Sequence, residues 1–117
     1  MPHVQILGPC RVRDLGAPLS RIVESYSAGV LKVQDACLDA AATHLILEVV
    51  VVEGYLRQSF FLLVRQEEDG VLVRCHPFCA PQKTDGVKRL IALVARRCLQ
   101  ACPGSRVGNT NLTPFLA

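Results

Sequence analysis

The chain has 117 residues, of which half are apolar and a fifth are charged, and its formal net charge is +3. This composition is typical of a folded domain and excludes a disordered chain. The longest apolar runs, residues 45–52 and 60–64, are much shorter than the roughly 18 residues of a membrane-spanning helix, so we expect no transmembrane segment.

No cluster of Gly, Pro or Ser divides the sequence, so we expect one domain over residues 1–117. The first residues, Met1-Pro2-His3-Val4, lack the basic, apolar and small-residue regions of a secretory signal, which favours a cytoplasmic protein. In a reducing compartment the six cysteines are expected to be thiols and not disulfides.

The first half of the chain is expected to form one strand and one long helix. Residues 4–12 are short, apolar and β-branched, which predicts a strand. Pro18 can occupy the first position of a helix, where no backbone N–H is needed. Beyond it, apolar residues recur at steps of three and four, at Leu19, Ile22, Tyr26, Val30, Val33, Cys37 and Ala40. This spacing predicts a helix over residues 18–40.

Three β-rich segments follow, over residues 44–53, 56–68 and 71–78, with turns predicted at Gly54-Tyr55 and Asp69-Gly70. Thr84 or Asp85 can cap a second helix, which should stop at Pro103-Gly104. Its apolar stripe is Val87, Leu90, Ile91, Val94, Cys98 and Cys102. Residues 105–117 are predicted to be an irregular tail. The expected fold is therefore α+β, with two layers, the order β-α-β-β-β-α, and two helices on one face of an antiparallel meander.

The two turns set how the three β-rich segments pair. The predicted pairs are Ile46 with Leu63, Glu48 with Phe61, Val50 with Ser59, Arg65 with Arg74, and Leu63 with His76. Because side chains alternate along a strand, one face of the sheet is apolar throughout and should form the core. The other face has an apolar centre and a polar rim, made of Ile46, Glu48, Val50, Phe61, Leu63, Arg74, His76 and Phe78.

An apolar centre with a polar rim is typical of an interaction surface. The leading hypothesis is therefore a non-enzymatic interaction or assembly module that forms a homodimer through this face, or a subunit of a larger assembly. Two alternatives stay open: the C-terminal tail could cover the face with Leu112 and Phe115, or the face could form a ligand groove.

The second helix supports a different hypothesis. Residues 82–117 contain six basic residues and one acidic residue, a net charge of +5, and the helix carries Lys88, Arg89, Arg96 and Arg97 opposite its apolar stripe. Such a face can contact phosphates, which predicts an RNA-binding or phosphate-backbone-binding domain. The order α-β-β-β-α is similar to that of double-stranded RNA-binding domains, although their dense lysine cluster is reduced to Lys83, Lys88 and Arg89.

Chemistry at single residues is supported less well. Glu48 in an apolar run, with His76 nearby, suggests a small enzyme or ligand-binding domain as a third hypothesis. Cys75 and Cys79 would lie about 13 Å apart on an extended strand, too far to share a metal. Cys98 and Cys102 share the buried face of the helix, so we expect core thiols. The sequence therefore predicts no metal site, and because it contains no Gly-rich phosphate loop or dinucleotide motif, it also predicts no cofactor.

Overall fold

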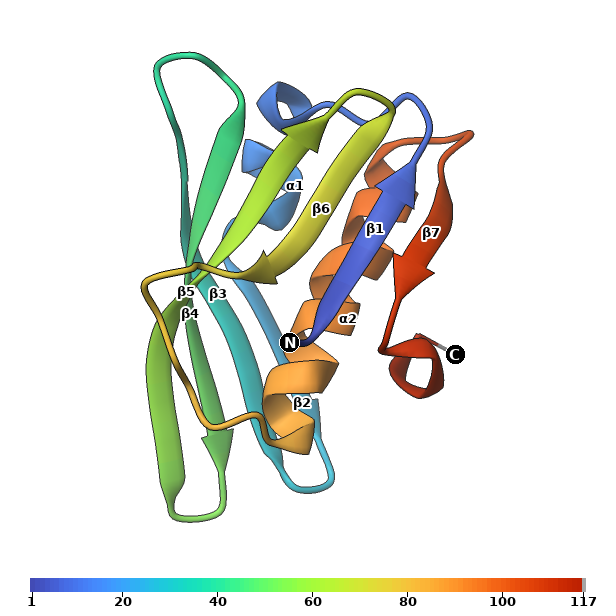
Figure 1. Ribbon diagram of the computed structural model, residues 1–117. Coiled ribbons are helices and arrows are strands. Elements are labelled where there is room, and N and C mark those ends of the chain that lie inside the picture. The colour runs from blue at the N-terminus through green and yellow to red at the C-terminus, as the bar shows by residue number, and fades with distance from the viewer. Residues whose placement is uncertain (117) are drawn as a thin grey trace.

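The structure is a computed structural model that describes residues 1–116. Seven strands form one curled sheet in the order β2-β3-β4-β5-β6-β1-β7, and the strand pairs between residues 1 and 116 are antiparallel (Figure 1). The elements are β1 (His3–Leu7), η1 (Val12–Asp14), α1 (Gly16–Leu19), β2 (Ile22–Tyr26), β3 (Gly29–Leu38), β4 (His44–Glu53), β5 (Leu56–Glu67), β6 (Gly70–Cys75), α2 (Asp85–Ala101), β7 (Arg106–Thr110) and η2 (Thr113–Phe115).

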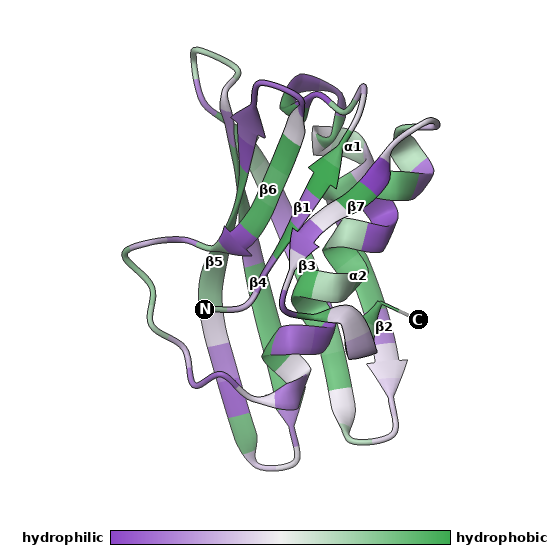
Figure 2. Cartoon of the chain, turned by 45° about the vertical axis from the view of Figure 1, so that its right-hand side comes forward, coloured by the Kyte–Doolittle hydropathy of each residue, from purple (hydrophilic) through white to green (hydrophobic). Residues whose placement is uncertain are grey.

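The core lies between α2 and the inner face of the curled sheet. The strands contribute every second residue, for example Leu45, Leu47, Val49 and Val51 of β4, because side chains alternate across a sheet. Residues 90–95 of α2 are all buried, so the helix is enclosed on several sides. Figure 2 shows hydrophobic residues on α2 and on the strands that curl around it.

The β4–β5 hairpin and α2 agree with the sequence prediction. Glu48 pairs with Phe61, and Gly54 takes the positive φ of 59° in the turn. The Thr84 side chain caps α2 by accepting a hydrogen bond from the Val87 amide at 3.3 Å. Glu53, at the end of β4, accepts hydrogen bonds from the Gly86 amide at 3.0 Å and from the Thr84 hydroxyl. These contacts tie the start of α2 to the sheet.

The predicted long helix over residues 18–40 is wrong. Only Gly16–Leu19 is helical in this region, and the rest forms the hairpin of β2 and β3. Leu31 and Val33 are buried with a period of two, while Val30 and Cys37, which were placed in the helical stripe, are not buried. At Gly29 the backbone approaches Val52 so closely that a Cβ would lie 1.7 Å from its carbonyl oxygen. Pairing with β4 therefore outweighed the helical spacing.

The predicted order β-α-β-β-β-α and the likeness to double-stranded RNA-binding domains fail with that helix. The first strand also ends earlier than predicted, at Leu7 and not at Val12, because Gly8 has a φ of 119° and Pro9 follows it. What holds is the coarser description, an α+β fold with a curled antiparallel sheet.

The β5–β6 hairpin keeps the predicted faces but not the predicted pairs. Its turn is centred on residues 68–69, one residue earlier than predicted, and Arg65 lies opposite Leu72 and not opposite Arg74. The positive φ falls on Gly70, at 128°, so this is not the type I′ turn that Asp-Gly favours. The register differs by two residues, and a shift of two leaves every side chain on its face.

The prediction of an irregular tail over residues 105–117 is wrong for its first part. Arg106–Thr110 forms β7, which pairs with β1 at the edge of the sheet, and Thr113–Phe115 forms the short helix η2. Leu112 is buried, and Phe115 packs against the core cluster. The weak β propensity of Gly108 and Asn109 hid this strand, whose pairing depends on the free edge of β1.

Candidate interface on the outer face of the sheet

The outer face of the sheet, opposite α2, brings most of the predicted interface residues together. Ile46, Glu48 and Val50 lie on β4, Phe61 and Leu63 on β5, and Arg74 on β6. Ile46 pairs with Leu63, and Leu63 pairs with Arg74, so these three residues form a continuous row. His76 and Phe78 follow the end of β6 and belong to the loop before α2, not to a strand as predicted.

The apolar centre of this outer face is partly open to solvent. Val50 and Leu63 are buried, although they are not members of the core cluster. Phe61 is 45% exposed and Phe78 is 95% exposed. The two exposed aromatic rings therefore form an apolar surface that is in contact with solvent.

A shallow groove with a volume of about 530 Å³ lies in this surface. Its walls come from β3, β4, β5 and the loop after β6, with the lining residues Cys37, Ile46, Phe61, His76, Phe78 and Cys79. The His76 and Phe78 rings lie 5.3 Å apart, and the Phe78 amide donates a hydrogen bond to Nδ1 of His76 at 3.2 Å. Because Nδ1 accepts, a neutral His76 carries its proton on Nε2, which is the nitrogen that can donate to a partner.

The charges around the apolar centre lie on opposite sides of it. Glu48 lies on β4, beside Phe61, and Arg74 lies on β6, beside Leu63. Neither is in one of the three ion pairs found among residues 1–116. The Arg74 side chain donates to the backbone carbonyl of Cys75 at 3.3 Å. The midpoint between the two charged residues therefore falls on β5, between Phe61 and Leu63.

The C-terminal segment does not cover this face. The β7 strand continues the sheet beside β1, and η2 contacts α2 (Figure 1). Arg96 of α2 donates a hydrogen bond to the Phe115 carbonyl at 2.9 Å, which holds this segment on the helix side. The alternative in which Leu112 and Phe115 cover the outer face is therefore wrong.

The basic residues of α2 are partly engaged within the chain. The Arg89 guanidinium lies over the rings of Tyr26 and Phe115, at 5.3 and 5.7 Å. Arg96 lies 3.9 Å from the Glu24 carboxylate in addition to its bond to Phe115. Two of the four predicted phosphate contacts thus fasten β2 and the C-terminal segment to the helix, and Lys88 and Arg97 are half-buried.

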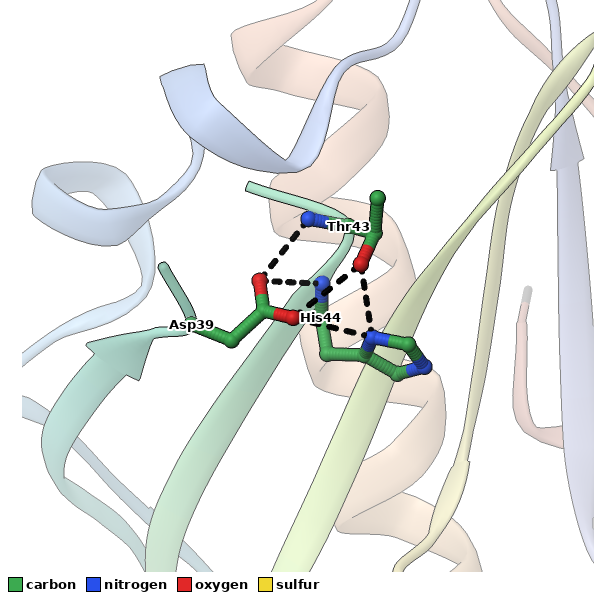
Figure 3. A network of polar contacts seen from close by, with 3 residues as sticks. All are labelled: Asp39, Thr43 and His44. Atoms are coloured by element: carbon green, nitrogen blue, oxygen red, sulfur yellow. Dashed lines mark hydrogen bonds and ion pairs between the residues drawn. The ribbon is translucent and has the colours of Figure 1, made fainter. Parts of the chain in front are cut away.

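A compact polar network of Asp39, Thr43 and His44 lies in the β3–β4 turn (Figure 3). The His44 amide, together with the Thr43 amide and hydroxyl, donates to the Asp39 carboxylate and lowers the pKa of Asp39 to about 2. Thr43 and Asp39 both contact Nδ1 of His44, at 2.8 and 3.2 Å. A catalytic triad places the nucleophile and the carboxylate on opposite ring nitrogens. Here Thr43 and Asp39 contact the same ring nitrogen, so the network does not have the geometry of a catalytic triad. Its hydrogen bonds stabilise the turn.

The acid–base hypothesis gains no support from the contacts of its two residues. Glu48 is exposed, and the hydrogen bond from the His76 amide goes to the Phe61 carbonyl at 2.9 Å. Within residues 1–116, no group of three or more His, Cys, Asp or Glu side chains comes together as a metal site. The six cysteines are free; four are buried, whereas Cys79 is half-buried and Cys37 is exposed.

Sequence reasoning missed two residues of the outer face. Cys37 was placed in the apolar stripe of the predicted helix, and Cys79 was weighed as a metal ligand with Cys75, but both line the groove. The signal for Cys37 was present, since Asp35 and Cys37 alternate with Ala36 as expected for a strand, but a bulge between Val33 and Asp35 breaks the period.

The comparisons with known proteins give no further assignment. No protein-family model, no curated protein and no solved structure matches the chain. In residues 1–116, neither helix combines the length and the apolar character that crossing a bilayer requires.

Proposed function

We propose that this chain is a protein-interaction module that forms a homodimer through the outer face of its sheet. The observation that carries the proposal is the apolar centre, in which the exposed Phe61 and Phe78 lie beside a groove on a face that the C-terminal segment leaves open. Together the two rings expose on the order of 250 Å², which at about 25 cal/mol per Å² favours burial by several kcal/mol.

The charges favour a second copy over an unrelated partner. A two-fold axis that lies in the interface and crosses β5 obliquely, between Phe61 and Leu63 and at right angles to the line from Glu48 to Arg74, would place Glu48 of one copy against Arg74 of the other. The same axis would bring Phe61 and Leu63 of the two copies into contact, because residues near a two-fold axis meet their own equivalents. One patch then supplies an apolar centre and two complementary ion pairs at its rim.

Light scattering of variants tests the proposal. The wild-type chain should have the molar mass of a dimer, and Phe61→Arg should convert it to a folded monomer because two guanidinium groups would meet at the axis. Tyr55→Arg is the matched control, since Tyr55 is a fully exposed aromatic residue at the turn of the same hairpin and lies outside the interface. This control should remain a dimer.

Charge reversal gives a second test with a distinct outcome. Glu48→Arg and Arg74→Glu should each weaken the dimer, since each places like charges together, and the double variant should restore it. A wild-type monomer at concentrations of about 100 μM, or a dimer that tolerates Phe61→Arg, would show that this face has another role.

A further inference from the structure

Two buried thiols lie in contact although they are far apart in the sequence. Cys10 lies in the connection between β1 and η1, and Cys102 follows the last residue of α2. They are separated by 92 positions, and their Sγ atoms are 2.7 Å apart. Cys10 is 1% exposed and Cys102 is 7% exposed. The contact between the two sulfurs thus lies inside the core, between a segment near the start of the chain and a segment near its end.

The backbone holds the two segments side by side. A Cβ on Gly104 would lie 3.7 Å from the Pro9 ring, and a Cβ on Gly8 would lie 3.0 Å from the Cα of Ser105. The Cys102 amide also donates to the Cys98 carbonyl at 3.0 Å, which fixes Cys102 to the last turn of the helix. Packing and hydrogen bonds therefore fix the backbone segments that carry the two cysteines.

We propose that Cys10 and Cys102 are a redox site, and that a small-molecule disulfide converts them to an intramolecular disulfide bond. A disulfide has a bond length of about 2.05 Å, so a movement of less than about 1 Å closes it. The bond would fasten the β1–η1 connection to the end of α2. This site is independent of the outer face and of the proposed dimer.

The chemistry proceeds in two exchange steps. The thiolate of Cys102, the more exposed of the two residues, attacks one sulfur of the small-molecule disulfide, forms a mixed disulfide and releases one thiol. The Cys10 thiolate then attacks the Cys102 sulfur, which forms the Cys10–Cys102 bond and releases the second thiol. Two protein thiols are oxidised and one external disulfide is reduced to two thiols, so the electrons and protons balance.

The environment makes this reaction slow at neutral pH. Burial, and then contact with the Cys10 thiol, raises the pKa of Cys102 to about 12. Contact with the Cys98 side chain, and then burial, raises the pKa of Cys10 still further. Since only the thiolate reacts, the rate should rise about tenfold for each pH unit between pH 7 and pH 10. An excess of a reducing thiol reagent should reduce the Cys10–Cys102 disulfide back to two thiols.

The test uses the full chain with Cys37→Ser and Cys79→Ser, which removes the two most accessible thiols. After incubation with oxidised glutathione, the protein is denatured and its remaining thiols are alkylated. Two of its four remaining thiols should be protected from alkylation, and the chain should carry no covalently bound glutathione. The oxidised chain should melt roughly 10–20 °C higher, because the bond closes a loop of most of the chain.

Peptide mapping assigns the bond. Trypsin leaves Cys10 on residues 1–11 and both Cys98 and Cys102 on residues 98–106, so the wild-type crosslink alone does not separate the two partners. In Cys98→Ala the crosslink should persist, and in Cys102→Ala it should vanish with the rise in melting temperature. These two substitutions lie one helical turn apart and serve as each other's control.

Three results would overturn the proposal. The first is that all four thiols still react with the alkylating reagent after incubation with oxidised glutathione at pH 9. The crosslink could persist in Cys102→Ala and vanish in Cys98→Ala, which would assign the bond to Cys10 and Cys98. A crosslink between two chains would exclude an internal bond. If Cys102→Ala does not fold, the mapping of Cys98→Ala still decides between the partners.

Discussion

Phe61 and Leu62 are neighbours on β5 that point to opposite faces of the sheet, and they separate the interface from the core. Leu62 is fully buried in the core, whereas Phe61 is 45% exposed on the outer face. Replacing a buried leucine by alanine removes its packing and leaves a cavity, which costs about 3 kcal/mol and at most about 5 kcal/mol. Leu62→Ala should therefore lower the melting temperature by about 10 °C.

Phe61→Ala should behave differently because Phe61, which is 45% exposed in the single chain, would be fully buried only in the proposed dimer. At protein concentrations well below the dissociation constant, the variant should be within about 1 kcal/mol of wild type. At high concentration wild type gains stability from association and Phe61→Ala does not. Urea unfolding at several protein concentrations measures both effects. If Phe61→Ala destabilises the chain as much as Leu62→Ala does, and equally at every concentration, the assignment of the two faces is wrong.

Two further predictions concern the parts that hold the sheet together. Gly86→Ala should destabilise the chain by about 1–3 kcal/mol in thermal unfolding, because a Cβ would lie 2.5 Å from the Glu53 carboxyl and 2.7 Å from the Val51 side chain; an unchanged melting temperature would contradict the contact between α2 and β4. The lowered pKa of Asp39 means that its turn stabilises the fold above about pH 4 and loses this contribution as the pH falls toward about 2. Asp39→Asn should flatten the acid side of a plot of stability against pH, whereas a plot identical to that of wild type would contradict it.

The sequence predicts the centre of the fold well because its local signals and its tertiary contacts agree. Gly54 supplies the positive φ of the β4–β5 turn, and the turn fixes which residues of β4 and β5 face outward. Thr84 supplies a helix cap in front of an apolar stripe, and α2 begins where expected. The outer face could therefore be predicted from alternation alone, even though the β5–β6 register was wrong by two residues.

The regions that were predicted wrongly depend on distant partners. Ile22 and Val33 fit a helical stripe, but they pair with each other across the β2–β3 hairpin. Residues 106–110 have little intrinsic tendency to form a strand and are ordered by β1, about a hundred positions earlier. The contact between Cys10 and Cys102 has the same origin, since no local pattern indicates which cysteines meet.

NMR on a mixed sample, in which one copy is ¹³C-labelled and the other is not, tests whether the chain dimerises through the outer face. Filtered experiments on such a sample detect contacts between copies alone. A dimer through the outer face should give contacts between the Phe61 ring of one copy and the Leu63 methyl groups of the other, and Phe61→Arg should abolish them. Contacts at the edge strands β2 or β7, or the absence of any contact between copies at millimolar concentration, would contradict it.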